Sequence, residues 1–470
     1  MLTKIARWWW GDFQEGELKK FGLLSLIFGL VIGVYWFLRP LKDSVFSSVV
    51  GSNYIPWAKM LSLIVVFPLV LIYSKLVDMF PRQRMFYALC TIYGLLALLF
   101  AFLMNNSTYG LSAGLYGADR WWGWAWYVYV ESFGSLIVAL FWAFTADTTE
   151  PESAARGYPL VAFGGQLGNI FGPLALVLIM HNFAHFELGP EGDLPAGAAQ
   201  TSASVHAGSV VFAAVIMAFI IVLVKIFMAT VPKEQLVGYH AKNEKSEGSE
   251  PGFFEGLRLI FSSAYLIGIF AIISFYEIIV TVLDFNFKTL ASEQFTMSHE
   301  LTKYLAHYGI WVGVVSMLSI LLGINKIQRS LGIGASLALL PILIATAVLT
   351  FKSYPVVSVL FWIMVFSKAV NYALNQPSMK QLYIPTSKDA KYKSQAFIEM
   401  YGSRGSKAFA SSVNLWRKTF IEKFGGVAGV EKFIFMCTIA SLGIVGIWLP
   451  VTFYLGRKFK KAVDEKSVVV

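Results

Sequence analysis

The sequence has few charged residues and only two cysteines. Of its 470 residues, 14% are Asp, Glu, Lys or Arg, whereas 57% are hydrophobic and the mean hydropathy is +0.63. This composition excludes an ordinary soluble domain and indicates a protein that resides in a bilayer. Cys90 and Cys437 both fall in apolar segments. We therefore expect them to act as small hydrophobic side chains and not to form a disulfide.

The sequence also lacks the motifs of several enzyme classes. It contains no phosphate-binding loop of the form GxxxxGK[ST] and no cluster of Cys and His with metal-ligand spacing. We therefore expect no catalytic residues, no metal site, no cofactor and no enzymatic activity. The net charge of +10 would suit a nucleic-acid partner, but in a membrane protein it more often reflects basic cytoplasmic loops. We therefore expect no nucleic-acid partner.

Long apolar runs replace the missing charge. A helix needs roughly 20 apolar residues to cross the hydrocarbon core, and we find about twelve such windows. The runs are continuous instead of alternating every second residue, which predicts helices and not a barrel. The expected fold class is an all-α membrane protein with about 12 transmembrane helices, near 21–38, 56–76, 86–104, 122–146, 158–180, 207–230, 257–284, 304–323, 331–350, 355–374, 395–416 and 432–456.

The distribution of Lys and Arg predicts the orientation. Basic residues gather at both termini and in alternate connections, whereas the connection at 181–208 has neither Lys nor Arg. By the positive-inside rule both termini are cytoplasmic. The first 20 residues look like an interfacial segment with aromatic anchors, which favours a bacterial inner membrane over a plastid. One connection breaks the pattern, because basic residues follow the eleventh window on the predicted outer side: Arg417, Lys418, Lys423 and Lys432.

A polar segment at 232–252 divides the chain almost at its middle. Six windows lie on either side, so we expect an N-terminal six-helix half at 1–231, a cytoplasmic linker at 232–252 and a C-terminal six-helix half at 253–470. Two six-helix halves joined by an inside loop are the organisation of major-facilitator-like transporters.

Charged residues at the expected depth of the membrane or at the ends of the windows are the candidate functional positions. On insertion scales a charge at bilayer depth costs roughly 2.5 to 3.5 kcal/mol, so it is tolerated mainly where it faces a polar cavity or a partner. The candidate positions are Lys42 with Asp43, Glu131, Asp147, Glu277, Asp284 with Lys288, Lys368, Glu399, Arg404 and Lys407.

The segment "RPLKD" interrupts the first apolar run. Lys42 and Asp43 are neighbours, so on a helix they point about 100° apart and Lys42 needs another partner. Pro40 is expected to break the helix beside the charge, and a broken helix with a buried cation is one way to build an anion site. The alternative is that Arg39 and Lys42 extend to the outer interface.

Glu131 and the basic residues of the eleventh window each have two possible roles. Glu131 lies near the middle of an otherwise uncharged run and either pairs with a basic residue as a structural element or acts in transport. Arg404 and Lys407 share a helix face among small residues. That face either allows close helix packing or binds a phosphorylated anion.

Four segments resemble the nucleotide transporter family of ATP/ADP translocases of plastids and intracellular bacteria. They are "FLRPLKDSVF" at 37–46, "YVYVESFGSLIVALFWAF" at 127–144, "YEIIVTVLDFNFK" at 276–288 and "YIPTSKDAKYKSQAFIEMYGSRGSK" at 383–407. The resemblance extends from about residue 25 to 455.

The resemblance implies which charged residues act in transport. The family's essential lysine, glutamate, acidic residue and lysine fall on Lys42, Glu131, Asp284 and Lys407, with Arg404 as the neighbouring arginine. Secondary candidates are Arg39, Asp43, Asp147, Lys288 and Glu399. The sequence departs from the family pattern at Asp284, which replaces a glutamate, and at Glu399, which replaces an aspartate.

The implied function is ATP/ADP exchange by alternating access, with ATP, ADP or other nucleotides as substrates and membrane lipid as surroundings. The lysines Lys42 and Lys407 would bind the phosphates, and the carboxylates Glu131 and Asp284 would pair with them when no nucleotide is present. The alternative is a proton-coupled importer of nucleotides or of another phosphorylated organic anion.

Overall fold

The computed structural model describes residues 16–149, 151–183, 198–236, 258, 260–295, 297–321, 325–386, 394, 397–465 and 467–469. Within this part every predicted window is overlapped by a helix, and the secondary structure is α-helical with a few short 3₁₀ and π segments. Residues 237–252 of the predicted linker at 232–252 lie outside the described residues, as do residues 1–15.

Helices α2 to α7 come from the first half of the sequence. They are α2 (Glu17–Val49), α3 (Ile55–Met79), α4 (Arg82–Asn105), α5 (Trp121–Asp147), α6 (Pro151–Phe183) and α7 (Ala198–Thr230). The second half contributes α9 (Ala264–Gln294), α10 (Ser298–Leu321), α11 (Asn325–Ser353), α12 (Val357–Val370), α13 (Gln376–Leu382), α15 (Ser403–Phe424) and α16 (Gly426–Asp464).

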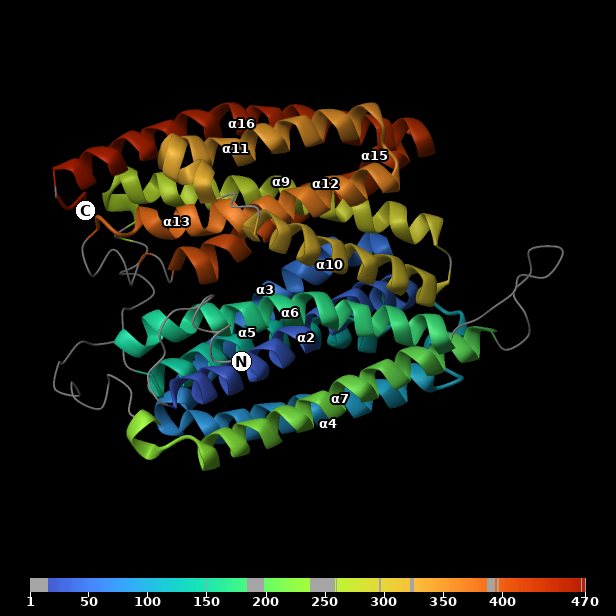
Figure 1. Cartoon of the computed structure of the whole chain (residues 1–470). Coiled ribbons are helices and arrows are strands. Elements are labelled where there is room, and N and C mark those ends of the chain that lie inside the picture. Colours follow the sequence, from blue (N-terminus) through green and yellow to red (C-terminus); the bar gives the residue numbers. More distant parts are fainter. Residues whose placement is uncertain are drawn as a thin grey trace. The chain divides into compact units, whose positions relative to one another are not determined.

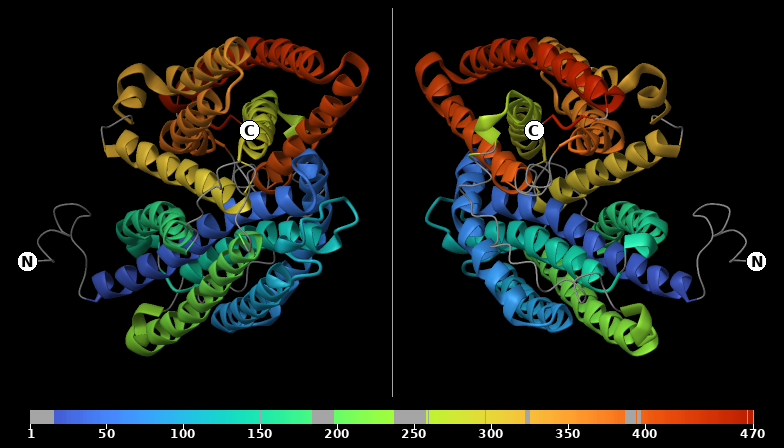
Figure 2. Two further views of the ribbon diagram at one scale, coloured as in Figure 1. Left: turned by 90° about the vertical axis from the view of Figure 1, so that its right-hand side faces the viewer. Right: turned by 90° about the vertical axis from the view of Figure 1, so that its left-hand side faces the viewer.

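The chain divides into two compact units. Unit 1 comprises Met1–Tyr54, Ile64–Glu247 and Phe295–Gly313, and unit 2 comprises Ile55–Leu63, Gly248–Gln294 and Val314–Val470. The start of α3 therefore belongs to unit 2 and the start of α10 to unit 1. In unit 1, α2 packs along α6, and α4 lies beside α7 (Figures 1 and 2). In unit 2, α11 packs along α16, and α15 packs against α9 (Figure 1).

Ten helical segments of the described part are long and apolar enough to cross a membrane. α10 and α15, the eighth and eleventh predicted windows, are not among the ten. α15 is the more polar of these two helices because it carries several Lys and Arg side chains. The sequence nevertheless folds into an all-α, multi-pass membrane protein, as predicted.

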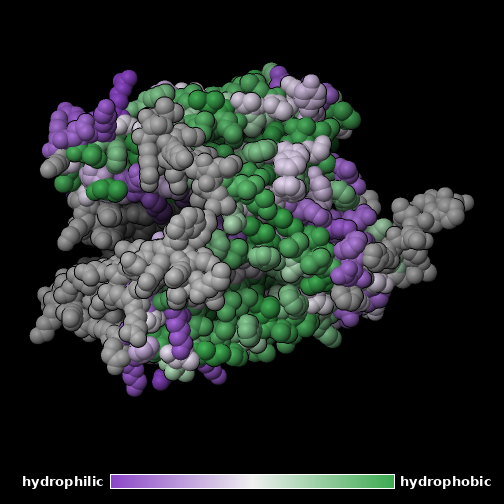
Figure 3. All heavy atoms as spheres, in the orientation of Figure 1, coloured by the Kyte–Doolittle hydropathy of each residue, from purple (hydrophilic) through white to green (hydrophobic). Residues whose placement is uncertain are grey.

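The surface of α4 shows how the bilayer shapes the pattern of side chains. Its inward face buries Cys90, Phe86, Ala97 and Met104, yet its outward face is equally apolar, with exposed residues one or two turns apart: Ile92 51%, Leu95 62%, Leu99 51% and Phe102 64%. A helix that is hydrophobic on all sides must be surrounded by protein and lipid, not water. In Figure 3 hydrophobic atoms cover the flanks of the described helices, and hydrophilic atoms gather toward helix ends.

Several helices extend beyond the predicted windows, and in two of them the extension changes the place of charged residues. α9 extends to Gln294, ten residues beyond the predicted end of the seventh window, so Asp284 lies well inside a helix. α15 extends to Phe424, so Arg417 and Lys418 lie on a helix and not in a connection. The eleventh window was therefore placed too short, because its last turns are too polar to be recognised by hydropathy.

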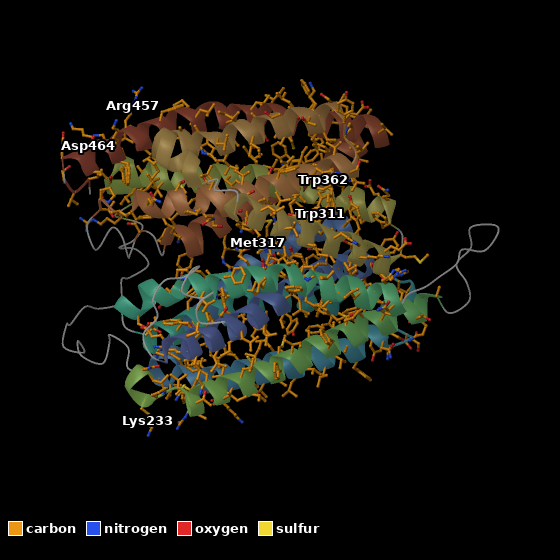
Figure 4. The ribbon with its side chains drawn as sticks, viewed as in Figure 1. Lys233, Trp311, Met317, Trp362, Arg457 and Asp464 are labelled. Atoms are coloured by element: carbon orange, nitrogen blue, oxygen red, sulfur yellow. The ribbon has the colours of Figure 1, made fainter. Side chains whose placement is uncertain are left out.

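Both cysteines are free and buried, which confirms their predicted role as small hydrophobic residues. Cys437 packs in a cluster of unit 2 with Val282, Ala410 and Phe433. In contrast to the buried cysteines, some charged side chains lie near helix ends. Figure 4 labels Arg457 and Asp464 in the last turns of α16 and Lys233 after α7.

Candidate functional site

Lys42 lies at the centre of a buried ionic cluster in unit 1. Its ammonium forms an ion pair with the Glu131 carboxylate from α5 and lies 3.6 Å from the Asp43 carboxylate. The same ammonium sits 4.3 Å from the centre of the Tyr127 ring. Lys42 and Asp43 are each only 3% exposed. A lysine so enclosed cannot extend to an interface, so the interfacial alternative for Lys42 is wrong.

The expected helix break in this segment is also wrong. α2 is continuous through Pro40 and ends at Val49, so the helix does not break beside the charge. Proline removes one backbone donor, and membrane helices tolerate that loss when neighbouring helices enclose the segment. The expectation that Lys42 needs a partner besides Asp43 is met by Glu131, and the Asp43 carboxylate also lies 3.6 Å from the ammonium.

Arg39 occupies the preceding turn of α2. Its guanidinium lies over the Trp36 ring, 4.8 Å from the ring centre, and the residue is partly buried. Such a cation–π contact stabilises a guanidinium where water is scarce.

Asp284 holds two lysines in unit 2. Its Oδ2 atom lies 2.8 Å from the Lys59 Nζ of α3 and 2.9 Å from the Lys288 Nζ one turn along α9. The predicted pairing of Asp284 with Lys407 is therefore wrong. Sequence reasoning assigned Lys59 no role, although a lysine four residues into the second apolar window was a visible signal.

Lys407 has Glu277 as its partner. The two side chains approach to 3.3 Å, and the Ser403 hydroxyl donates a hydrogen bond of 2.8 Å to the same carboxylate oxygen. Glu277 lies on α9 almost two turns before Asp284, which is why it reaches α15 at the level of Lys407. The Lys407 side chain is 45% exposed, so this cation is accessible in a way that Lys42 is not.

The neighbourhood of Lys407 begins in an unusual helical turn. Residues Ile398–Gly402 form a π turn that continues directly into α15, and Arg404 follows on the next turn, partly buried. A second π turn, Asn371–Asn375, interrupts the tenth window after Lys368. Such turns are often found at functional sites because they redirect side chains. Glu399 lies in the first π turn, but its side chain is outside the described part.

Asp147 is the last residue of α5. Its Oδ2 atom lies 3.0 Å from the Arg82 Nε at the start of α4. This contact joins the end of α5 to the start of α4. On α5, Asp147 follows Glu131, the partner of Lys42, by 16 residues. Arg417, one of the four basic residues that break the predicted orientation pattern, is 6% exposed and lies 3.1 Å from Glu293 near the end of α9.

A second polar network in unit 1 lies next to the Lys42 cluster in sequence. The Ser44 hydroxyl is 2.5 Å from the Thr302 hydroxyl of α10, which is 2.9 Å from His206 Nε2 of α7. The opposite nitrogen of His206 lies 2.7 Å from the Ser202 carbonyl. All three of these side chains are fully buried. The network ties the start of α10 to α2 and α7.

Within the described residues no three His, Cys, Asp or Glu side chains come together as a metal site. The groups that the Lys42 and Asp284 clusters present are lysines held by carboxylates, and such ammonium groups form charge-assisted contacts with anions.

The chain resembles known nucleotide carriers along nearly its whole length. The family described as "TLC ATP/ADP transporter" matches residues 2–459. "ADP,ATP carrier protein 4" of Rickettsia bellii is 23% identical over 512 residues, covering 98% of this chain and 94% of the relative. "ADP,ATP carrier protein 1, chloroplastic" of Arabidopsis thaliana is 24% identical over 500 residues, covering 97% and 76%.

Solved transporters share the fold. A bacterial homologue of the human lysosomal transporter Spinster, in an inward-facing and unoccupied conformation, superposes with a TM-score of 0.57 at 15% identity, covering 96% of this chain and 99% of that one. A bacterial homologue of the iron transporter ferroportin gives 0.59 at 12% identity, covering 94% and 100%. The predicted major-facilitator-like architecture is confirmed.

Proposed function

Because the chain belongs to the TLC ATP/ADP transporter family, we propose that it exchanges ATP for ADP across a membrane by alternating access. The observation that carries this proposal is the family match over residues 2–459, within which the matched positions Lys42, Glu131, Asp284 and Lys407 are all ion-paired. The relatives are named ADP,ATP carriers, which does not favour a proton-coupled importer.

The lysines are the proposed phosphate ligands. Nucleotide phosphates carry several negative charges, and an ammonium that leaves a carboxylate for a phosphate exchanges one charge-assisted contact for another. Lys42 exchanges Glu131 for phosphate in unit 1, and Lys407 exchanges Glu277 in unit 2. Arg404 adds a guanidinium on the same helix as Lys407. The carboxylates stabilise the lysines while the carrier holds no nucleotide.

We also propose that the protein lies in a bacterial inner membrane with both termini in the cytoplasm. The absence of Lys and Arg from 181–208 and the basic residues near both termini support cytoplasmic termini. Carriers of Rickettsia and Chlamydia among the relatives support a bacterial inner membrane. The halves are proposed as 1–231 and 253–470, joined by 232–252, and transport is proposed to proceed without catalytic chemistry.

Uptake by proteoliposomes tests the exchange. Purified protein is reconstituted with or without internal ADP, and entry of labelled ATP is followed over time. Internal ADP is expected to accelerate entry strongly, because a carrier with several cations and no bound anion is reluctant to reorient. The variants Lys42→Ala and Lys407→Ala are expected to abolish entry, whereas Lys461→Ala, at an exposed helix end, leaves it unchanged. Uptake that ignores internal nucleotide but collapses with an uncoupler contradicts exchange.

A further inference from the structure

Helices α15 and α16 form a tight hairpin in unit 2 (Figure 1). α15 ends at Phe424 and α16 begins at Gly426. Gly425 between them has a φ of 84°, a left-handed conformation that glycine adopts without strain. A Cβ added at Gly429 would lie 2.5 Å from the carbonyl oxygen of Phe420, so glycine also lets α16 begin close to α15. The hairpin therefore fixes the last turn of α15 beside the first turns of α16.

Two lysines of the hairpin meet at one aromatic ring. The Lys423 ammonium lies 5.5 Å from the centre of the Phe424 ring, and the Lys432 ammonium lies 3.7 Å from the same centre. Both lysines and the ring are exposed. Lys423 belongs to α15 and Lys432 to α16, so the hairpin brings the two ammonium groups together.

These two lysines differ from the other basic residues near the end of α15 in having no carboxylate partner. Arg417 lies 3.1 Å from Glu293, and Lys418 lies 3.7 Å from Glu422. In the described part of the chain, the two lysines at the Phe424 ring form no ion pair. Their ammonium groups are therefore available to an anion from the surroundings.

The two lysines also lie at the edge of an apolar surface. Phe409 and Trp416 on α15 and Phe435 and Ile439 on α16 all have exposed side chains. In a membrane protein such side chains face the acyl chains of lipids. Lys432 lies one turn before Phe435 on α16. Tryptophan is enriched at this boundary of a bilayer, and lysine side chains extend there to the headgroups.

We propose that Lys423 and Lys432 bind the phosphate of an anionic phospholipid, whose acyl chains lie along the exposed apolar residues of α15 and α16. The phosphodiester accepts charge-assisted hydrogen bonds from the ammonium groups. A zwitterionic lipid carries a cation of its own, which competes with the lysines, so it binds more weakly. Free phosphate shares the ionic chemistry but has no acyl chain to bury against the hairpin.

The lipid site lies on the helix that carries Arg404 and Lys407. α15 is not among the ten segments that are long and apolar enough to cross a membrane. A lipid that binds the folded hairpin stabilises it by mass action and so holds the last turn of α15 at the membrane boundary. This inference requires the membrane fold but not the exchange of ATP for ADP.

Lipid binding by the purified protein tests the site. Native mass spectrometry in detergent measures the affinity for phosphatidylglycerol and for phosphatidylcholine with the same acyl chains. The parent is expected to prefer phosphatidylglycerol. Two lysines near an anionic lipid predict roughly thirtyfold weaker phosphatidylglycerol binding by Lys423→Gln with Lys432→Gln. Lys423→Arg with Lys432→Arg keeps both charges and is expected to stay within about threefold of the parent.

Lys458→Gln with Lys461→Gln is the matched control, because it removes two exposed lysines from the other end of α16. This variant is expected to keep the parental affinity for phosphatidylglycerol. An equal loss in both double Gln variants would show that the lipid responds only to net charge, which overturns the site. Equal affinity of the parent for the two lipids, or unchanged binding by Lys423→Gln with Lys432→Gln, overturns it as well.

Inorganic phosphate distinguishes a lipid headgroup from a soluble anion. An excess of phosphate is expected to leave phosphatidylglycerol bound, because phosphate cannot use the apolar surface. Displacement of the lipid, together with phosphate binding that is lost in Lys423→Gln with Lys432→Gln, would assign the two lysines to a soluble anion instead. None of these measurements depends on transport. A failed lipid site therefore leaves ATP/ADP exchange standing, and failed exchange leaves the lipid site standing.

Discussion

At the scale of single residues, the two lysines proposed as phosphate ligands are held in different surroundings. Lys42 is enclosed by two carboxylates and an aromatic ring, whereas Lys407 has one carboxylate and a side chain that is 45% exposed. Breaking a buried pair leaves an uncompensated charge, which commonly costs several kcal/mol, but an exposed pair contributes roughly 1 kcal/mol or less. The consequences of removing each partner should therefore differ.

Glu131→Gln is expected to slow exchange while leaving nucleotide binding intact or tighter. The amide keeps the size of the side chain and removes a carboxylate that competes with phosphate for Lys42. Lys42 retains Asp43 at 3.6 Å, so the fold should survive. The comparison is between the exchange rate in proteoliposomes and ATP affinity in detergent, with Glu465→Gln as an exposed control. Equal losses of affinity and turnover would mean that Glu131 contacts the substrate directly.

A double-mutant cycle distinguishes Glu277 from Asp284 as the partner of Lys407. Thermal unfolding of purified Lys407→Ala, Glu277→Gln and the double variant should give a coupling of about 0.2 to 1 kcal/mol, as expected for a partly exposed pair. The parallel cycle with Asp284→Asn should give about zero, because Lys59 and Lys288 are the lysines on that carboxylate. The reverse order of couplings would restore Asp284 as the partner of Lys407.

The sequence alone located these charges but not their partners. Burial cost singled out the charged positions at bilayer depth. The family resemblance then pointed to Lys42, Glu131, Asp284 and Lys407 and implied that the two carboxylates pair with the two lysines. The partner of Lys407 could not be read from spacing, because Glu277 and Asp284 lie seven residues apart on one helix and only the packing of α15 decides between them. Lys59 was missed because a single lysine near a helix start usually marks an interface.

At the scale of helices, glycine determines how closely α2 and α6 approach. A Cβ added at Gly168 would meet the backbone of Gly29 and lie 2.9 Å from the backbone nitrogen of Gly33. Backbone atoms cannot move aside as a flexible side chain can. Small residues of this kind allow membrane helices to pack at short range, where dispersion is strongest.

Gly168→Ala is therefore expected to destabilise unit 1 by about 1 to 3 kcal/mol, the usual cost of overpacking. Gly208→Ala on α7 is the matched control, because a Cβ there has no atom within 4 Å, and helix propensity favours alanine by up to about 1 kcal/mol. Apparent melting temperatures of the two purified variants decide the question. A Gly168→Ala protein that melts with or above the control would show that the helices separate without cost.

The ends of several helices could not be predicted from the sequence. Apolar runs predicted a helix in every window, but hydropathy stopped early wherever polar residues were buried against other helices. The last turns of α9 can hold Asp284 and Lys288 because these two residues form an ion pair. The last turns of α15 can likewise hold Arg417, which forms an ion pair with Glu293. The uninterrupted course of α2 through Pro40 likewise depends on enclosure by neighbours, which no local pattern reports.

At the scale of the whole molecule, the distribution of basic residues remains the basis for orientation. The exception noted in the sequence is accounted for by the structure in part, since Arg417 is buried on α15 and neutralised by Glu293 instead of lying in an outer loop. Lys432 lies 3.7 Å from the centre of the Phe424 ring, so it too has a local role. Charges engaged in this way weigh little in the positive-inside rule, which concerns basic residues flanking the membrane.

Thiol labelling in intact cells tests the predicted orientation directly. Cys90 and Cys437 are buried and should not react, so single cysteines at the exposed positions Ser107 and Ser467 report alone. Ser107 follows α4 and Ser467 follows α16. With cytoplasmic termini, a membrane-impermeant maleimide should label Ser107→Cys in intact cells and Ser467→Cys only after lysis. The unsubstituted protein, expected to stay unlabelled in both, is the control. Labelling of Ser467→Cys without lysis would place the C-terminus outside and contradict the assignment drawn from the basic residues.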